Sequence, residues 1–351
     1  DGSASPPGIG ALTWPDMGTN AKDASIDQFT GCVLNGQVII NKKHTALGSY
    51  DYPDSNIVTA DTTNPAPPSQ TLTGAAVFAY RQFLVLVDCI VAGLSLPNRL
   101  QHSSSVDRGL FGWNADWWPT AENDANFTTL GDQRGRLVGG ITLGGSALVL
   151  GERQLWLMTY TGGPLVMAYR NLTREVGTLS RHGFTAIDQR AFIFDDNDIV
   201  MTDGQRVQSI ADGWVRRRIF NEINSEQTDR VWVQYNRPGQ EIWFAYPEGN
   251  NKYCNRAAVY HLPTQKWGFR SLGEQQSKAQ GFRYGASGIY DDSTQALTWA
   301  TDTGTWVPDT DPWRATALSG ARDDFIVIDV RDDTVADGQW LASVGSTDTT
   351  G

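Results

Sequence analysis

Cysteine and histidine are scarce in this chain, which limits the sites that it can build. Its 351 residues include three cysteines and four histidines. The cysteines (Cys32, Cys89, Cys254) lie far apart and none is at metal-ligand spacing from another, so we expect buried free thiols rather than a disulfide framework or a zinc site. The histidines are equally isolated from potential ligands. The sequence therefore predicts no metal and no cofactor.

Positive charge and long apolar runs are also in short supply. Lys and Arg number 28 against 39 Asp and Glu, which leaves a net charge of −11. A broad nucleic-acid-binding face needs clustered basic residues, so this balance argues against one, although DNA can still pass over such a surface without being gripped. No run of about 18 apolar residues is present, and the sequence predicts no membrane-spanning segment.

Motifs for catalysis are missing as well. The chain contains no GxSxG nucleophile turn, no HExxH zinc motif and no Gly-rich loop between a strand and a helix. The acidic stretch 195–198 fails the EF-hand pattern, because Val200 and Arg206 stand where Gly and Glu are required. The sequence predicts a hairpin turn there, no catalytic residue, and a protein that is not an enzyme.

A recurring hairpin is the main feature that is present. In each copy a short apolar strand meets a tight polar turn, and the second strand usually carries an aromatic residue. Six copies occur, at Val33–Ile40, Val77–Val87, Ala147–Met158, Ala191–Met201, Ile242–Tyr260 and Ala296–Val307. Apolar and polar residues alternate at period two, whereas a helical pattern is confined to a short stretch around Trp214–Ile223. The sequence therefore predicts an all-β fold.

The spacing of the copies favours a β-propeller. The strand centres are separated by roughly 44–64 residues, and a four-stranded blade takes about 40–50. Six copies predict six blades; a β-sandwich is the alternative. We expect residues 1–28 to form an arm or linker and residues 29–330 the propeller, with an inserted loop at about 99–133. Residues 331–351 are expected to be a polar, truncated C-terminal segment.

Two segments stand out as candidate contact surfaces. The inserted loop carries Trp113, Trp117 and Trp118, which could stack on a sugar, form a subunit contact, or fold back onto their own blade. The basic run Arg216, Arg217 and Arg218 could contact DNA phosphates or an acidic neighbouring subunit, or lie on a solvated turn.

Several stretches together resemble one family, the β-propeller tail proteins of short-tailed bacteriophages (podoviruses). This family comprises nozzle or tail-hub proteins, also described as tail tubular or packaged-DNA-stabilising proteins. In chain order, the matching stretches are Phe83–Val87, a "PNR…S" turn at Pro97–Arg99 and Ser103, Trp113–Trp118, Leu137–Ile141, Leu148–Trp156, Ala191–Gly204, Gln240–Pro247 and Val259–Trp267. They cover a little over half of the chain.

The resemblance implies a non-enzymatic part of the virion. Copies are expected to form a ring, a hexamer in this family, below the portal and its head–tail adaptor. Such a ring extends the channel that holds double-stranded DNA and then conducts it during ejection, without reading its sequence. The alternative is a propeller that binds or cleaves carbohydrate, suggested by the Trp-rich loop and a partial Asp-box at Thr301–Trp306.

Overall fold

The computed structural model describes residues 29–35, 37–44, 48–50, 57–59, 71–105, 116–272, 282–290, 322–329 and 341–343. The N-terminal arm expected at residues 1–28 lies outside this range. The hairpin copy at Ala296–Val307, which contains the partial Asp-box, also lies outside it, as does Trp113.

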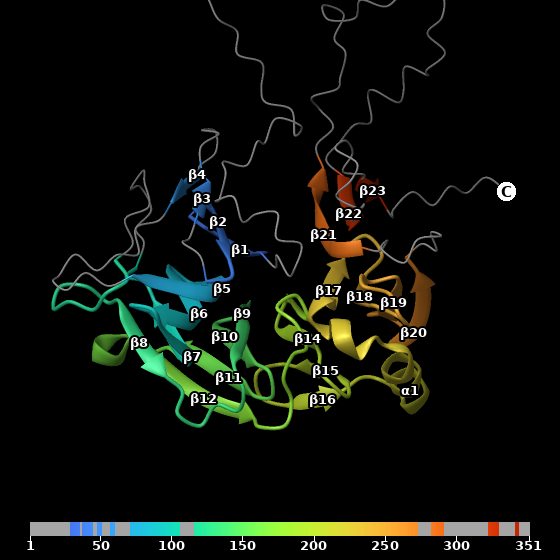
Figure 1. Ribbon diagram of the computed structural model, residues 1–351, viewed down its shortest axis with the longest axis horizontal. Helices are drawn as coiled ribbons and strands as arrows, with labels where there is room; N and C mark the ends of the chain where they lie inside the picture. Colours follow the sequence, from blue (N-terminus) through green and yellow to red (C-terminus); the bar gives the residue numbers. More distant parts are fainter. Residues whose placement is uncertain are drawn as a thin grey trace, which may run out of the picture. The chain divides into compact units, whose positions relative to one another are not determined.

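The described residues form six sheets whose strands follow one another along the chain (Figure 1). The first contains β1 (Phe29–Leu34), β2 (Gln37–Lys42), β3 (Gly48–Tyr50) and β4 (Ile57–Thr59). The second contains β5 (Leu72–Tyr80), β6 (Phe83–Val91), β7 (Leu94–His102) and β8 (Asn126–Thr129). The third contains β9 (Leu137–Leu143), β10 (Ser146–Gly151), β11 (Leu155–Tyr160) and β12 (Met167–Thr173).

The later sheets repeat this plan. The fourth contains β13 (Phe184–Ile187), β14 (Arg190–Phe194), β15 (Ile199–Thr202) and β16 (Val207–Ser209). The fifth contains β17 (Trp232–Asn236), β18 (Glu241–Tyr246), β19 (Arg256–His261) and β20 (Lys266–Ser271). The sixth has three strands within the described residues, β21 (Phe282–Tyr290), β22 (Arg322–Asp329) and β23 (Leu341–Ser343). One α-helix, α1 (Gly213–Glu222), and two 3₁₀ turns, η3 (Gly163–Leu165) and η4 (Ser225–Arg230), complete the described elements.

Each sheet is a meander of consecutive strands, which is the organisation of a propeller blade. Neighbouring strands pair in antiparallel register; in β10 and β11, for example, Val149 lies opposite Trp156. The protein is therefore an all-β chain of the β-propeller class, as the repeat predicted. Five of the six expected hairpins are confirmed, as β1–β2, β5–β6, β10–β11, β14–β15 and β18–β19.

Two expected boundaries were wrong. The insertion was placed at residues 99–133, yet β7 continues to His102 and β8 pairs with it, so that His102 lies opposite Asn126. The inserted loop therefore starts after β7 and ends before β8. The propeller was expected to end at residue 330, but β23 pairs with β22 and Leu341 lies opposite Ile328. Alternation of apolar and polar residues indicates a strand. It does not show which later segment of the chain supplies the outer strand of the same sheet, and the two boundaries depended on this.

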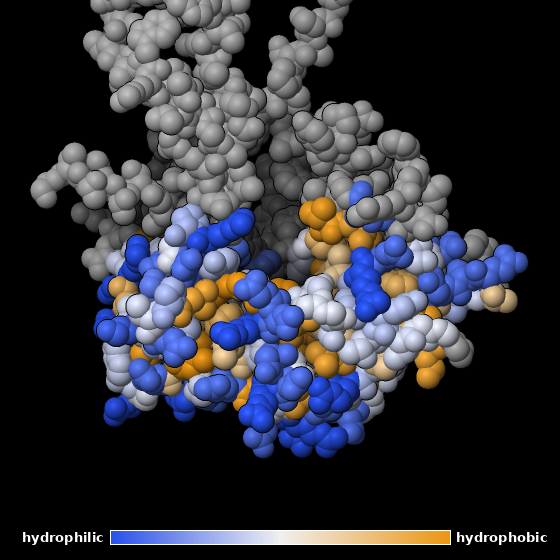
Figure 2. Space-filling view, turned by 180° about the vertical axis from the view of Figure 1, so that it is seen from behind, coloured by the Kyte–Doolittle hydropathy of each residue, from blue (hydrophilic) through white to orange (hydrophobic). Residues whose placement is uncertain are grey.

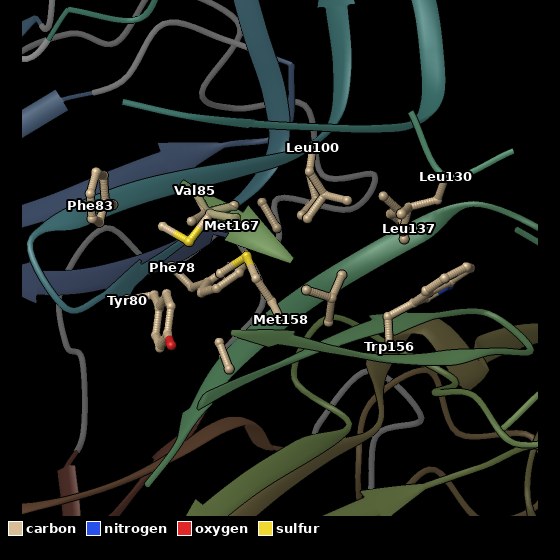
Figure 3. Close-up of a cluster of buried hydrophobic side chains, with 14 of the residues drawn as sticks. Phe78, Tyr80, Phe83, Val85, Leu100, Leu130, Leu137, Trp156, Met158 and Met167 are labelled. Atoms are coloured by element: carbon tan, nitrogen blue, oxygen red, sulfur yellow. The ribbon is translucent and has the colours of Figure 1, made fainter. Parts of the chain in front are cut away.

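The chain divides into two compact units, one of residues 1–181 and 186–210 and the other of residues 182–185 and 211–351. In the first unit, the main core lies between the β5–β8 and β9–β12 sheets, where labelled side chains from both sheets meet (Figure 3). Phe78, Val85 and Met158 are at most 5% exposed. Gly140 of β9 lets the sheets approach, because a Cβ atom there would collide with the Phe78 ring.

The second unit has its own core and carries α1. Trp232, Trp243 and Val259 pack together on one face of the β17–β20 sheet. Helix α1 forms at the position that the sequence indicated. Val215 and Ile219, one turn apart, are its buried residues and face inward, which leaves Trp214, Arg217 and Arg218 at the surface.

Candidate interaction surface

The Trp-rich loop folds back onto the β5–β8 sheet. Trp117 is only 1% exposed and packs in a buried cluster with Leu72, Leu84 and Leu86, and Trp118 is half-buried against the same cluster. The base of the loop is closed by two hydrogen bonds. The Ser104 N–H donates to the Asp116 carbonyl oxygen (2.7 Å), and the Asp116 N–H donates to Ser104 Oγ (3.0 Å). Trp117 is therefore not part of an open platform for a sugar or a subunit, and the fold-back interpretation holds for this part of the loop.

The Pro97–Arg99 motif lies inside strand β7, where the sequence indicated a turn. Its Arg99 is 8% exposed, and the guanidinium carbon lies 3.8 Å from the centroid of the Phe127 ring. Arg99 Nη2 donates to Gln101 Oε1 (2.8 Å), and Gln101 Nε2 donates to the Trp117 carbonyl oxygen (2.6 Å). The motif thus belongs to a buried polar network that holds the Trp-rich loop in place.

The three arginines of the basic run lie on α1. Arg216 is half-buried, whereas Arg217 and Arg218 are exposed. Arg217 Nε donates to the Gly213 carbonyl oxygen (3.1 Å) one turn earlier. Arg218 forms an ion pair with Glu222 (3.7 Å) and stacks its guanidinium carbon 4.4 Å from the centroid of the Phe269 ring. The run therefore lies on a helix and not in a turn, and two of its three side chains are solvent-exposed.

An aromatic ridge accompanies these arginines. The rings of Trp214, on α1, and Phe269, on β20, lie 5.5 Å apart, so this end of the helix rests against the outer strand of the sheet (Figure 1). Trp214 is 50% exposed and Phe269 is half-buried. On the face shown in Figure 2, apolar patches lie between hydrophilic residues. We call Trp214, Phe269, Arg217 and Arg218 the α1 face.

A second charged cluster joins the first three sheets of the first unit. Asp88 is 1% exposed and sits at a bulge of β6, where its backbone φ is 52°. Its carboxylate accepts two hydrogen bonds from Arg136, just before β9 (3.0 and 3.2 Å), and lies 3.7 Å from His44 Nε2, which follows β2. Burial lowers the pKa of His44, and burial likewise lowers the pKa of Arg181 beside this cluster. Asp88 and Arg136 pair as opposite charges, and with His44 they link residues next to three successive sheets.

The turn between β14 and β15 gathers negative charge. Asp195 is 6% exposed, and burial raises its pKa to about 6; the charges of Asp196 and Asp198 add to the shift, while a hydrogen bond from the Gly177 N–H (2.9 Å) opposes it. Asp196 is exposed and forms no ion pair with the described residues. We call residues 195–198 the acidic turn.

The cysteines and potential metal ligands of the described residues do not form a metal site. Among them, no three His, Cys, Asp or Glu side chains are grouped so as to hold a metal ion. Cys89 and Cys254 are buried free thiols, as predicted, while Cys32 is half-buried; burial raises the pKa of all three, to about 12 for Cys32 and Cys89. None of the helices in this part of the chain is long and apolar enough to cross a membrane.

Comparisons with known proteins give only distant likenesses. No known protein family and no curated protein matches the sequence. A crystal structure of Hsv2 from Kluyveromyces marxianus is similar over 72% of this chain, with 7% identity and a TM-score of 0.39. This chain spans 65% of the length of that structure. YCF48 bound to D1 peptide is similar over 74% of this chain and 70% of its own, with 10% identity and a TM-score of 0.45. At such values the likeness carries no information about function.

Sequence reasoning found the arginines but missed their setting. It identified neither Trp214 nor Phe269 as a surface feature, because the two residues are 55 positions apart and only packing brings them together. It also missed Asp88, which lies within an apolar run, FLVLVDCIV, of β6. A lone carboxylate in such a run was the available signal, because a buried charge needs a partner.

Proposed function

We propose that the protein is a structural subunit of a short-tailed bacteriophage tail and has no enzymatic activity. In this role copies form a ring-shaped nozzle or hub, a hexamer by resemblance, below the portal and adaptor. The ring extends the channel that retains the genome and then conducts it.

The observation that carries the proposal is the ordered set of family-like motifs. They lie on successive blades, as β6 with β7, then β9 to β11, β14 with β15, and β18 to β20. Each motif by itself is loose, and their order along the chain gives the resemblance its weight. The Pro97–Arg99 part of it lies in a strand, so that portion rests on residue identity and not on the expected turn.

The charge of the chain suits a conduit. DNA is a dense line of negative charge, and a wall that attracted it would slow ejection. A subunit with a net charge of −11 is not expected to grip passing DNA. The Trp-rich loop gives the carbohydrate alternative less support, because Trp117 is buried and unavailable for stacking on a sugar.

Electron microscopy tests the proposal directly. Images of the purified chain, or of tails from the parent particle, are expected to show rings with a central pore, and native mass spectrometry is expected to give a single ring stoichiometry. A chain that stays monomeric alone and is absent from any particle would contradict the proposal. Binding on a broad glycan array would favour the carbohydrate alternative instead.

A further inference from the structure

The α1 face carries two exposed arginines, Arg217 and Arg218. Arg216, Arg217 and Arg218 are consecutive, and Glu222 is the acidic residue of the helix. Arg218 is shared between Glu222 and the Phe269 ring. Arg217 is exposed, and it forms no ion pair with the described residues. Exposed charge without a counter-charge is available to a partner.

The same face offers apolar contact area on a rigid support. Trp and Arg are the residue types most enriched at the energetic centres of protein interfaces. Trp214 is half exposed and rests on Phe269, while Val215 and Ile219 anchor the helix in the core. A ring that is already held in position loses little conformational entropy on binding, so Trp214 is a suitable anchor for a partner.

A complementary surface exists on the other unit of the chain. The acidic turn places three carboxylates within four positions, and Asp196 projects from it without an ion-pair partner among the described residues. Burial raises the pKa of Asp195, and the neighbouring charges of Asp196 and Asp198 raise it further, as expected where negative charge gathers. Opposite charges on two separate surfaces of one chain are suited to contact between copies.

We propose that the α1 face of one copy docks on the acidic turn of a second copy, with Arg217 opposite Asp196 and Trp214 in the contact. The two surfaces differ, so the contact is head to tail; such contacts generate a closed ring when the rotation closes. The inference rests on the proposed function, because it assigns the surfaces that join subunits of the ring.

Double-stranded DNA is a different partner for the same arginines, and three observations disfavour it. Arg218 is partly neutralised by Glu222, and an exposed aromatic ridge adds nothing to a phosphate contact. The overall charge of −11 would also repel a polyanion approaching the chain. We therefore expect that α1 does not bind DNA, and the experiment below tests this as well.

The test is charge reversal and its rescue in the full chain. Arg217→Glu and Asp196→Arg are each expected to weaken self-association at least about tenfold, as for other close interfacial charge pairs. The double variant Arg217→Glu/Asp196→Arg restores opposite charges and is expected to recover assembly. Arg153→Glu, a reversal at an exposed arginine in the β10–β11 turn, is the matched control and should change nothing. Sedimentation velocity at low and high salt measures assembly, and circular dichroism checks folding.

The outcomes separate the inference from the function on which it rests. Rings that persist in folded Arg217→Glu, or a double variant that fails to recover, would overturn the assigned surfaces and leave the ring itself intact. A native chain that forms no ring, alone or in particles, would overturn the proposed function as well. If Arg217→Glu no longer shifts double-stranded DNA in a gel-shift assay while its assembly is unchanged, α1 binds DNA. That result would overturn the proposed contact between copies.

Discussion

The β5–β8 sheet and the region from the acidic turn to α1 use the same residue types in opposite ways. In the β5–β8 sheet, Trp117 is buried and Asp88 is paired with Arg136. In the later region, Trp214 is half exposed, and Asp195 is buried beside further carboxylates. Trp and Asp side chains stabilise the fold in the first region. In the second region the same residue types provide exposed aromatic area and a cluster of negative charge. This difference separates blade-building residues from candidate contact residues, and each prediction below tests one side of it.

The largest effect is expected for Trp117→Ala. The substitution removes a large side chain from a closed cluster and leaves a cavity, so the free energy of unfolding is expected to fall by about 3–5 kcal/mol. Urea denaturation followed by circular dichroism measures the change. A loss of less than about 1 kcal/mol would mean that the Trp-rich loop is not anchored as described.

Asp88→Asn is expected to cost about 1.5–3 kcal/mol, because it weakens the two hydrogen bonds that the half-exposed Arg136 guanidinium donates to the buried carboxylate. Asn tolerates the left-handed backbone at this bulge, so the change isolates the charge. The control is Asp132→Asn in the exposed pair with Arg174, where both side chains are more than half exposed and a loss within about 0.5 kcal/mol is expected. Equal losses of unfolding free energy for Asp88→Asn and Asp132→Asn would mean that the buried ion pair stabilises the protein no more than the exposed one.

Asp195→Asn is expected to stabilise the protein at neutral pH. The folded-state pKa of about 6 lies above the ordinary value of 3.8, so the stability contributed by protonated Asp195 is present below pH 4 and is lost as pH rises through 6. Asn keeps an oxygen for the Gly177 N–H and carries no charge. The variant is expected to exceed the native protein by about 1–3 kcal/mol above pH 6.

The measurement for Asp195→Asn is a series of urea denaturations between pH 4 and pH 8. The gap between variant and native protein should open across this range and be small at its acid end. Glu175→Gln, at an exposed position, is the control and should show no such trend. A gap that is independent of pH would mean that Asp195 has an ordinary pKa and a counter-charge.

The smallest stability effect is expected for Trp214→Ala. This is the same substitution as at Trp117, but the side chain is half exposed, so a loss of about 0.5–1 kcal/mol from the contact with Phe269 is expected. Self-association is expected to weaken more clearly than folding does. A loss comparable with that of Trp117→Ala would show that Trp214 belongs to the core and not to a contact surface.

Much of the fold could be predicted from sequence because hairpins are local. In β10–β11 and β14–β15, the two strands and their turn lie within about a dozen residues, so alternation and turn residues reveal them directly. The position of β8 could not be predicted in this way. It joins β7 across the inserted loop, and nothing in NFTT distinguishes an outer strand from loop.

Candidate surfaces were harder to predict than strands. The cluster of Trp residues left a sugar platform, a subunit contact and a fold-back onto its own blade open, and the structure shows Trp117 buried against its own sheet. The arginine run stays a candidate contact surface, and α1 confirmed the short helix that the sequence predicted there. Composition alone cannot separate these cases, because exposure depends on which distant residues meet the side chain.

The sequence by itself determined that this chain is a series of β-hairpins with an acidic surplus and few cysteines and histidines. These properties depend on local alternation, turn residues and composition, all of which act within a few positions. Tertiary structure alone decided that Trp117 lies in the core and Trp214 at the surface. It also decided that Asp88 pairs with Arg136, 48 positions away, whereas Asp195 lies next to other carboxylates. Burial and charge pairing are properties of distant contacts, and the packing of the sheets creates them.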